Sequence, residues 1–279
     1  MTGTLYVVAT PLGNLEDITM RALRVLKEVA LIAAEDTRHS RILLSHFGIT
    51  TPLTSYFDHV ERERAPRLVE RLKSGEDIAL ISDAGTPAIA DPGYRLVRAA
   101  IDAGIRVVPI PGPSAIMAGL SAAGVPTDRF AFEGFIPAKA AARRAFFERV
   151  AHEERTVVCF EAGRRLAAAL TDLAALQPDR GVVVAREVTK LYEDFARGTA
   201  AELAARAGGL VVRGEVTLLI APPENPAPAM PAEALRAEVA RRRSAGLHLK
   251  EIAKALADES GWSARDIYRI GIELESGEE

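Results

Sequence analysis

Short apolar runs of strand length recur along the chain and alternate with stretches of helical spacing. The runs lie at residues 4–10, 29–36, 77–83, 106–112, 156–162, 181–187 and 215–223. Between them, segments such as 17–28 and 93–104 repeat apolar residues at intervals of three and four, which is typical of amphipathic helices. This alternation predicts an α/β fold in which helices cover both faces of parallel or mixed sheets.

Two interruptions divide this pattern. Residues 122–150 form a hinge-like stretch followed by a basic helix, which indicates a boundary near residue 120. Residues 222–231, PPENPAPAMP, carry too much proline for a helix or a central strand. The chain after them is helical throughout, and two of its helices open after turns, as in a helix-turn-helix. We therefore expect a small helical appendage at the C-terminal side.

Composition narrows the classes of function. The chain has 279 residues, enough for one large α/β domain or two smaller ones, and a net charge of −3. A general polyanion-coating role is therefore disfavoured, and any nucleic-acid contact needs a local basic patch. The single cysteine, Cys159, lies inside an apolar run, so neither disulfides nor a zinc cluster are indicated. With no signal-peptide pattern and no apolar run of about 18 residues, we expect a cytoplasmic protein without membrane contact.

Four of the predicted strands end in loops rich in glycine, proline and polar side chains. They are ATPLGNLEDIT (9–19), AEDTRHS (34–40), SDAGTPAIADPG (82–93) and PIPGPSAIMA (109–118). The carboxyl ends of strands form the ligand crevice in open α/β sheets. Four such loops therefore predict one shared site.

Several kinds of site lack their sequence pattern. The chain contains no P-loop, no complete G-x-G-x-x-G after the first strand and no G-x-S-x-G. No cluster of ligands indicates a metal, and the five histidines are scattered. The loops offer backbone groups, a few carboxylates and small apolar residues, which suit a nucleoside-like or zwitterionic cofactor better than a polyphosphate.

The order and spacing of six segments resemble a known family. VATPLGNLEDIT, AEDTRHSRILL, SDAGTPAIADPG, PGPSA, FEGFIPAK and REVTKLYEDFARGT occur here as in the bacterial ribose 2′-O-methyltransferases of 16S ribosomal RNA, the cytidine-specific type I group. The resemblance covers residues 3–275 and places the chain in the tetrapyrrole methylase superfamily (class III methyltransferases), whose cofactor is S-adenosylmethionine. It implies methylation of a cytidine ribose in the decoding region, on 16S rRNA or the small ribosomal subunit, by a homodimer.

The resemblance also implies a domain plan. It predicts an N-terminal α/β domain at 1–119, a second α/β domain at 120–225 with the cofactor in a cleft between the two, and a C-terminal helical domain at 226–279.

By the same resemblance, loops from both halves hold the cofactor. Asp83 is the expected polar anchor, and a competing interpretation is that it caps the following helix. The full set of expected cofactor-binding residues is Pro11, Asp83, Gly85, Thr86, Ser114, Ala115, Phe160, Glu161 and Ala162.

Methylation of a hydroxyl benefits from a base that removes its proton during attack. Asp36, Glu187 and Lys190 are the candidates, because two loops place carboxylates beside cations at strand ends. Arg38 and Arg186 in the same loops are candidates for holding phosphate. For each of these residues a structural ion pair is the competing interpretation.

Local basic patches are the candidates for RNA contact despite the negative total charge. The first patch includes Lys139 and Arg143, and the second, in the helical tail, includes Arg241, Arg242 and Lys250. A solvated helix face is the competing interpretation of both.

Two other functions stay open at this point. One is methylation of a tetrapyrrole precursor, although the first loop reads TPLGN where that branch has G-x-G-P-G-D. The other is a non-catalytic RNA-binding protein of ribosome assembly, which cofactor binding would exclude.

Overall fold

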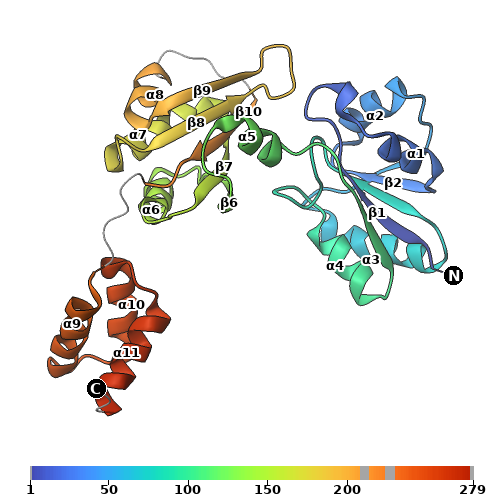
Figure 1. The fold of residues 1–279 in the computed structure, drawn as a ribbon. Coiled ribbons are helices and arrows are strands. Elements are labelled where there is room, and N and C mark those ends of the chain that lie inside the picture. Colours follow the sequence, from blue (N-terminus) through green and yellow to red (C-terminus); the bar gives the residue numbers. More distant parts are fainter. Residues whose placement is uncertain (1, 208–213, 224–229, 277–279) are drawn as a thin grey trace. The chain divides into compact units, whose positions relative to one another are not determined.

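The computed structural model describes residues 2–207, 214–223 and 230–276. The chain divides into two compact units, Met1–Pro222 and Pro223–Glu279. The first unit contains two five-stranded sheets and the second unit is helical (Figure 1). The predicted α/β architecture with a C-terminal helical region is therefore confirmed.

The first sheet is parallel and has the order β3-β2-β4-β1-β5. Its strands are β1 (Thr4–Val8), β2 (Leu31–Ala34), β3 (Leu53–Ser55), β4 (Ile78–Ile81) and β5 (Arg106–Ile110). Helices α1 (Met20–Glu28) and α2 (Thr37–His46) pack on one face, and α3 (Glu61–Lys73) and α4 (Tyr94–Asp102) pack on the other (Figure 1). Since side chains alternate along a strand, Leu5 joins one core cluster and Val8 the other.

The second sheet is mixed and has the order β6-β7-β10-β8-β9. Its strands are β6 (Phe130–Phe135), β7 (Thr156–Ala162), β8 (Gly181–Arg186), β9 (Asp194–Thr199) and β10 (Glu215–Ile220). Only β6 and β7 are parallel; the other three pairs are antiparallel. Helices α6 (Ala140–Ala151), α7 (Leu166–Leu176) and α8 (Ala200–Ala207) bury one face (Figure 1).

Helix α5 (Ala115–Ala123) follows the first sheet and packs on the second. Its side chains Ile116 and Leu120 join a cluster with Val158 and Val183 of β7 and β8. The predicted boundary at residue 119 lies inside this helix, and the three-domain division stays a prediction.

Three strands lie where the apolar pattern predicted none: β3, β6 and β9. β6 falls in the stretch interpreted as a hinge. Both of its terminal residues, Phe130 and Phe135, are exposed, and its pairing shifts register at Gly134. β3 and β9 carry polar residues on partly exposed positions. All three end their sheets, and their partly exposed polar positions interrupt the continuous apolar run on which the prediction depended.

The second unit contains α9 (Ala232–Ser244), α10 (Leu249–Ser260) and α11 (Ala264–Ser276). Its core comprises Leu235, Val239, Leu256 and Ile267, all fully buried. The indole N–H of Trp262 donates to the carbonyl of Met230 at 2.6 Å, which fastens the chain entering α9 to the turn before α11. Among the described residues, no helix is apolar over the length that a membrane crossing needs.

Candidate functional site

Hydrogen bonds join the loops that follow β1, β4 and β5. Thr10 and Gly85 exchange backbone hydrogen bonds of 2.8 and 2.9 Å. The hydroxyl of Thr10 donates to the carbonyl of Ser82 at 3.1 Å, and that of Thr86 donates to the carbonyl of Pro113 at 3.3 Å. The strand-end loops of the first sheet therefore form one continuous surface, as the sequence predicted.

The loop after β2 is held to the same surface by Asp83. The Asp83 carboxylate accepts from the backbone N–H of Asp36 at 3.0 Å, and the N–H of Asp83 donates to Glu35 at 3.2 Å. Asp36 itself caps α2, because its carboxylate accepts from the N–H of Arg38 at 2.8 Å. This hydrogen bond holds the pKa of Asp36 below its usual value. Asp83 and Asp36 thus bond to protein groups in the structure.

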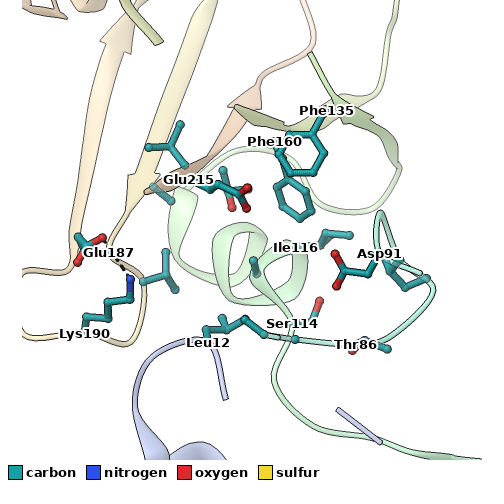
Figure 2. A pocket seen from close by; sticks show the side chains of 18 residues that line it. Leu12, Thr86, Asp91, Ser114, Ile116, Phe135, Phe160, Glu187, Lys190 and Glu215 are labelled. Carbon is teal, nitrogen blue, oxygen red and sulfur yellow. Dashed lines mark hydrogen bonds and ion pairs between the residues drawn. The ribbon is translucent and has the colours of Figure 1, made fainter. Parts of the chain in front are cut away.

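A cavity of about 270 Å³ lies where these loops meet the second sheet (Figure 2). Seven of the residues predicted for cofactor binding or catalysis line it: Gly85, Thr86, Ser114, Ala115, Phe160, Glu187 and Lys190. The sequence did not single out the remaining lining residues, which are Leu12, Ala84, Ile89, Asp91, Ile116, Phe135, Ala185, Val188, Glu215, Val216 and Thr217. Segments more than a hundred residues apart therefore contribute to one cavity.

Five predicted site residues are not part of the cavity lining: Pro11, Asp36, Asp83, Glu161 and Ala162. Glu161 is fully buried and pairs with Arg165 at 2.5 Å. Its carboxylate also accepts from the backbone N–H of Ala162 at 2.7 Å. These contacts turn Glu161 toward the protein interior.

Glu187 and Lys190 lie on the loop that connects β8 and β9. The ammonium of Lys190 is 3.3 Å from the carboxylate of Glu187, a pair drawn with a dashed line in Figure 2. Glu187 and Thr189 have positive φ angles of 50° and 71°, which are unfavourable for residues with a side chain. The backbone of this loop is held by the N–H of Thr189, which donates to Glu193 at 2.6 Å. Strained conformations that persist in this way are common at functional sites.

The Lys190 side chain lies against Gly13 of the loop after β1. A Cβ atom on Gly13 would stand 2.5 Å from Cγ of Lys190. We expect Gly13→Ala to push the Lys190 side chain away and to weaken the binding of a cavity ligand by about threefold to tenfold. Isothermal titration calorimetry of the variant and the wild type measures this. Gly48→Ala is the control for an added methyl group away from Lys190, since that position has open space; thermal unfolding measures the backbone strain that its positive φ adds. Equal affinities of Gly13→Ala and wild type would show that the contact is irrelevant to binding.

Asp91 is one of the cavity residues that the sequence did not predict. It lies in the ADPG segment, at the end of the loop that follows β4. Burial and the nearby charges of Glu35, Glu215 and Asp83 raise the pKa of Asp91 to about 7, against the opposing effect of a hydrogen bond with Ser82. The only sequence clue was a second carboxylate in the same strand-end loop.

The predicted RNA-binding residues of the first unit differ in the exposure and ion pairing of their cationic side chains. The Arg38 side chain is 90% exposed, and Lys139 is exposed at the N-cap of α6. Arg186 pairs with Asp194 at 2.8 Å across β8 and β9. Arg143 is buried and pairs with Asp172 at 2.8 Å, so this side chain does not offer a charge to an RNA phosphate. The helical periodicity of the basic segment points Arg143 inward.

In the second unit, Arg241 and Arg242 both pair with Glu238, at 2.6 and 2.7 Å. Arg242 also pairs with Glu259, at 2.5 Å. Lys250 is exposed on α10. Carboxylates of the same unit therefore pair with both arginines, while Lys250 extends into solvent.

Residues 4–204 match the family model of the tetrapyrrole (corrin/porphyrin) methylases. The chain is 49% identical to a protein of Pseudomonas aeruginosa called ribosomal RNA small subunit methyltransferase I, over 97% of both chains. It is 46% identical to the protein of the same name from Synechocystis, over 98% of this chain and 99% of that one.

Among solved structures, the methyltransferase CobJ matches with a TM-score of 0.61 at 18% identity, over 79% of this chain and 95% of that one. The uroporphyrin-III C-methyltransferase of Thermus thermophilus, solved in complex with S-adenosylhomocysteine, matches with a TM-score of 0.54 at 19% identity, over 78% of this chain and 97% of that one. At these identities the solved structures establish the shared fold.

Proposed function

The chain belongs to the ribosomal RNA small subunit methyltransferase I group of the tetrapyrrole methylase family, and we propose that it uses S-adenosylmethionine to methylate a ribose 2′-oxygen of 16S rRNA. The resemblance of its motifs specifies the acceptor as a cytidine in the decoding region. The observation that carries the proposal is that loops from both sheets converge on one cavity. Its relatives, which match over nearly their whole length, are named as methyltransferases of the same RNA.

The groups that line the cavity fit S-adenosylmethionine. At about 270 Å³ the cavity is near the lower end of ligand pockets, which span about 300–1,000 Å³. Ser114 and Ala115 lie at the N-terminus of α5, where backbone N–H groups and the helix dipole favour a carboxylate such as that of the methionine part. Phe135 and Phe160 supply aromatic surface to the cavity. When bound, the cofactor supplies an electrophilic methyl group on a sulfonium.

The residues of the chain itself then orient the acceptor and take up its proton. Glu187 is the proposed base, because its carboxylate lines the cavity. Lys190 is the alternative base. Asp36 was the third candidate; it lies outside the cavity lining, and its capping hydrogen bond makes its carboxylate a weaker base.

Contacts with RNA are proposed for exposed cations on both units. Arg38 and Lys139 in the first unit and Lys250 in the second have side chains in solvent. Arg38 lies 3.5 Å from the carboxylate of Asp36, and Arg186, Arg241 and Arg242 also pair with carboxylates, so a phosphate would have to share these four arginines. Such contacts make binding strongly dependent on salt concentration.

Removal of the helical unit tests its role in substrate binding. A protein that ends at Pro222 retains every residue that lines the cavity. We expect it to bind S-adenosylmethionine with unchanged affinity and to methylate small subunits at least tenfold more slowly, because loss of even a few phosphate contacts costs about this much. Filter-binding assays of tritium transfer measure the rate. Full activity of the truncated protein would dismiss a role of the second unit in RNA recognition.

The proposed reaction is tested on small ribosomal subunits from a bacterial strain that lacks the protein. The subunits are incubated with tritium-labelled S-adenosylmethionine, and their RNA is then hydrolysed with alkali. A methylated 2′-oxygen cannot attack the neighbouring phosphate, so the label is expected in an alkali-resistant dinucleotide. Label on a base, or no transfer, would refute the proposed reaction. Naked 16S rRNA, compared with subunits in the same assay, identifies the true substrate.

A homodimer in the bacterial cytoplasm is proposed from the same resemblance. Large apolar side chains exposed in the first unit, among them Met20, Leu191 and Tyr192, fit a surface that is covered in an assembly. Light scattering coupled to size-exclusion chromatography measures the mass in solution, and a monomer at micromolar concentration would contradict the dimer.

A further inference from the structure

Two carboxylates besides Glu187 line the cavity. Asp91, on the loop after β4, and Glu215, at the start of β10, both line it (Figure 2). Glu35 and Asp83 lie close enough to Asp91 for their charges to act on it. Two of these four acidic groups therefore line the cavity, and the other two act on Asp91 from outside the lining.

Asp91 and Glu215 form no ion pair among the residues that the structure describes. Lys190 is the cation of the cavity lining in that part of the chain, and it pairs with Glu187. Burial is the main cause that raises the pKa of Asp91 to about 7, and the negative charges of Glu35, Glu215 and Asp83 add to it.

The loop that carries Asp91 is held in place at its far end. The backbone N–H of Gly93 donates to the buried carboxylate of Glu61 at 2.6 Å, and Arg95 lies 3.5 Å from the same carboxylate. Gly93 has a φ of 142°, and a Cβ there would stand 2.9 Å from a methyl group of Leu80. Asp91 therefore lies on an ordered loop.

Aromatic rings complete this part of the cavity. Phe135 and Phe160 both line it, with ring centroids 5.5 Å apart in an edge-to-face arrangement. Carboxylates attract a cation through charge, and aromatic faces attract it through their quadrupole. Among the described residues, no group of three or more His, Cys, Asp or Glu side chains is arranged to hold a metal ion. An organic cation is the ligand that fits.

We propose that Asp91, together with Glu215, recognises the positive charge of the methyl donor, and that binding of the donor drives the carboxyl proton of Asp91 into solvent. The inference rests on the proposed function for the identity of the donor. S-adenosylmethionine carries two cationic groups, the sulfonium and the ammonium of its methionine part. The demethylated product keeps only the ammonium, so comparison of the two ligands identifies the group that Asp91 recognises.

The protonation of Asp91 before and after binding gives the number of protons released and the pH dependence of donor affinity. With a pKa of about 7, roughly three quarters of the Asp91 carboxyls are protonated at pH 6.5. A cation within about 4–6 Å lowers the pKa of a carboxyl by about 1–3. For a decrease of about 2, roughly 0.7 proton leaves per donor bound at pH 6.5 and affinity rises about fivefold from pH 6 to pH 7. The amino group of the donor stays mostly protonated in this range, since such groups have pKa values of about 7.7–8.0.

Calorimetry in two buffers with different ionisation enthalpies measures the released proton. The full-length wild type, Asp91→Asn and Asp179→Asn are each titrated at pH 6.5 with S-adenosylmethionine and with S-adenosylhomocysteine. Asp179 is an exposed carboxylate before β8, at the end of that strand opposite to Glu187, and serves as the matched control. Thermal unfolding verifies that each variant is folded. Glu215→Gln is a second variant that retains Asp91 and removes a neighbouring charge, so it is expected to reduce the proton release.

Release of about 0.7 proton by wild type and by Asp179→Asn, with loss of the release in Asp91→Asn, supports the proposal. Release with S-adenosylmethionine alone assigns the contact to the sulfonium, and equal release with both ligands assigns it to the ammonium. Donor binding without proton release, or with release that persists in Asp91→Asn, would overturn the proposal while leaving the methyltransferase function intact. No donor binding by the wild type would refute the function itself.

Discussion

Replacement of Glu187 with glutamine is expected to slow methyl transfer by about 10²-fold or more, the usual contribution of a base that acts during attack. The amide has nearly the same shape but cannot take up a proton. It can still accept a hydrogen bond from Lys190, which lies 3.3 Å away in the wild type. Donor affinity should therefore change by less than about threefold. Single-turnover transfer of tritium to small subunits at saturating donor measures the chemical step.

Glu193→Gln is the matched control for Glu187→Gln. Glu193 lies on the same loop and accepts the backbone hydrogen bond of Thr189 at 2.6 Å, which a glutamine oxygen can also accept. We expect this variant to retain nearly full activity. A normal single-turnover rate for Glu187→Gln would exclude Glu187 as the base, and a slow Lys190→Met variant would then assign that role to Lys190.

Replacement of Glu161 with alanine should destabilise the first unit by about 3–5 kcal/mol. Glu161 is fully buried, and its loss leaves the guanidinium of Arg165 without its partner at 2.5 Å. It also leaves the N–H of Ala162 without its acceptor. The cost is large because the Arg165 side chain, only 25% exposed, loses its counter-charge. Urea denaturation followed by circular dichroism measures the change in the free energy of unfolding.

Glu148→Ala provides the comparison for Glu161→Ala, because Glu148 is exposed on α6, which packs on the same sheet. A surface change of this kind is expected to remain within about 0.5 kcal/mol. If Glu161→Ala is as stable as Glu148→Ala but binds the donor poorly, Glu161 contacts the ligand directly, as the motif resemblance first implied. If both stability and binding fall, binding must be compared at a temperature where the variant remains folded.

The core strands and the convergence of the strand-end loops were predictable from the sequence. Buried strands such as β4, whose four residues are all buried, produce continuous apolar runs. The loops after such strands meet at one edge of a sheet, so Gly85, Thr86 and Ser114 were correctly expected to lie together. The edge strands β3, β6 and β9 were missed because half-exposed strands mix polar and apolar residues.

The direction of individual carboxylates was not predictable from the sequence. Asp83 and Asp91 lie in the same loop, eight positions apart. Asp83 accepts a backbone hydrogen bond from the neighbouring loop, whereas Asp91 lines the cavity. That distinction depends on the turn between them, in which Ala88 and Ala90 adopt positive φ angles of 67° and 64°. An alanine in the sequence does not predict a positive φ, because L residues rarely adopt one.

The structure of the protein bound to S-adenosylhomocysteine is the most direct test that the cavity is the donor site. The account predicts electron density for the ligand in contact with Thr86, Ser114 and Phe160, with Asp91 on the cationic side of its methionine part. Density on a different surface, or a cavity closed by the protein's own side chains at saturating ligand, would contradict it.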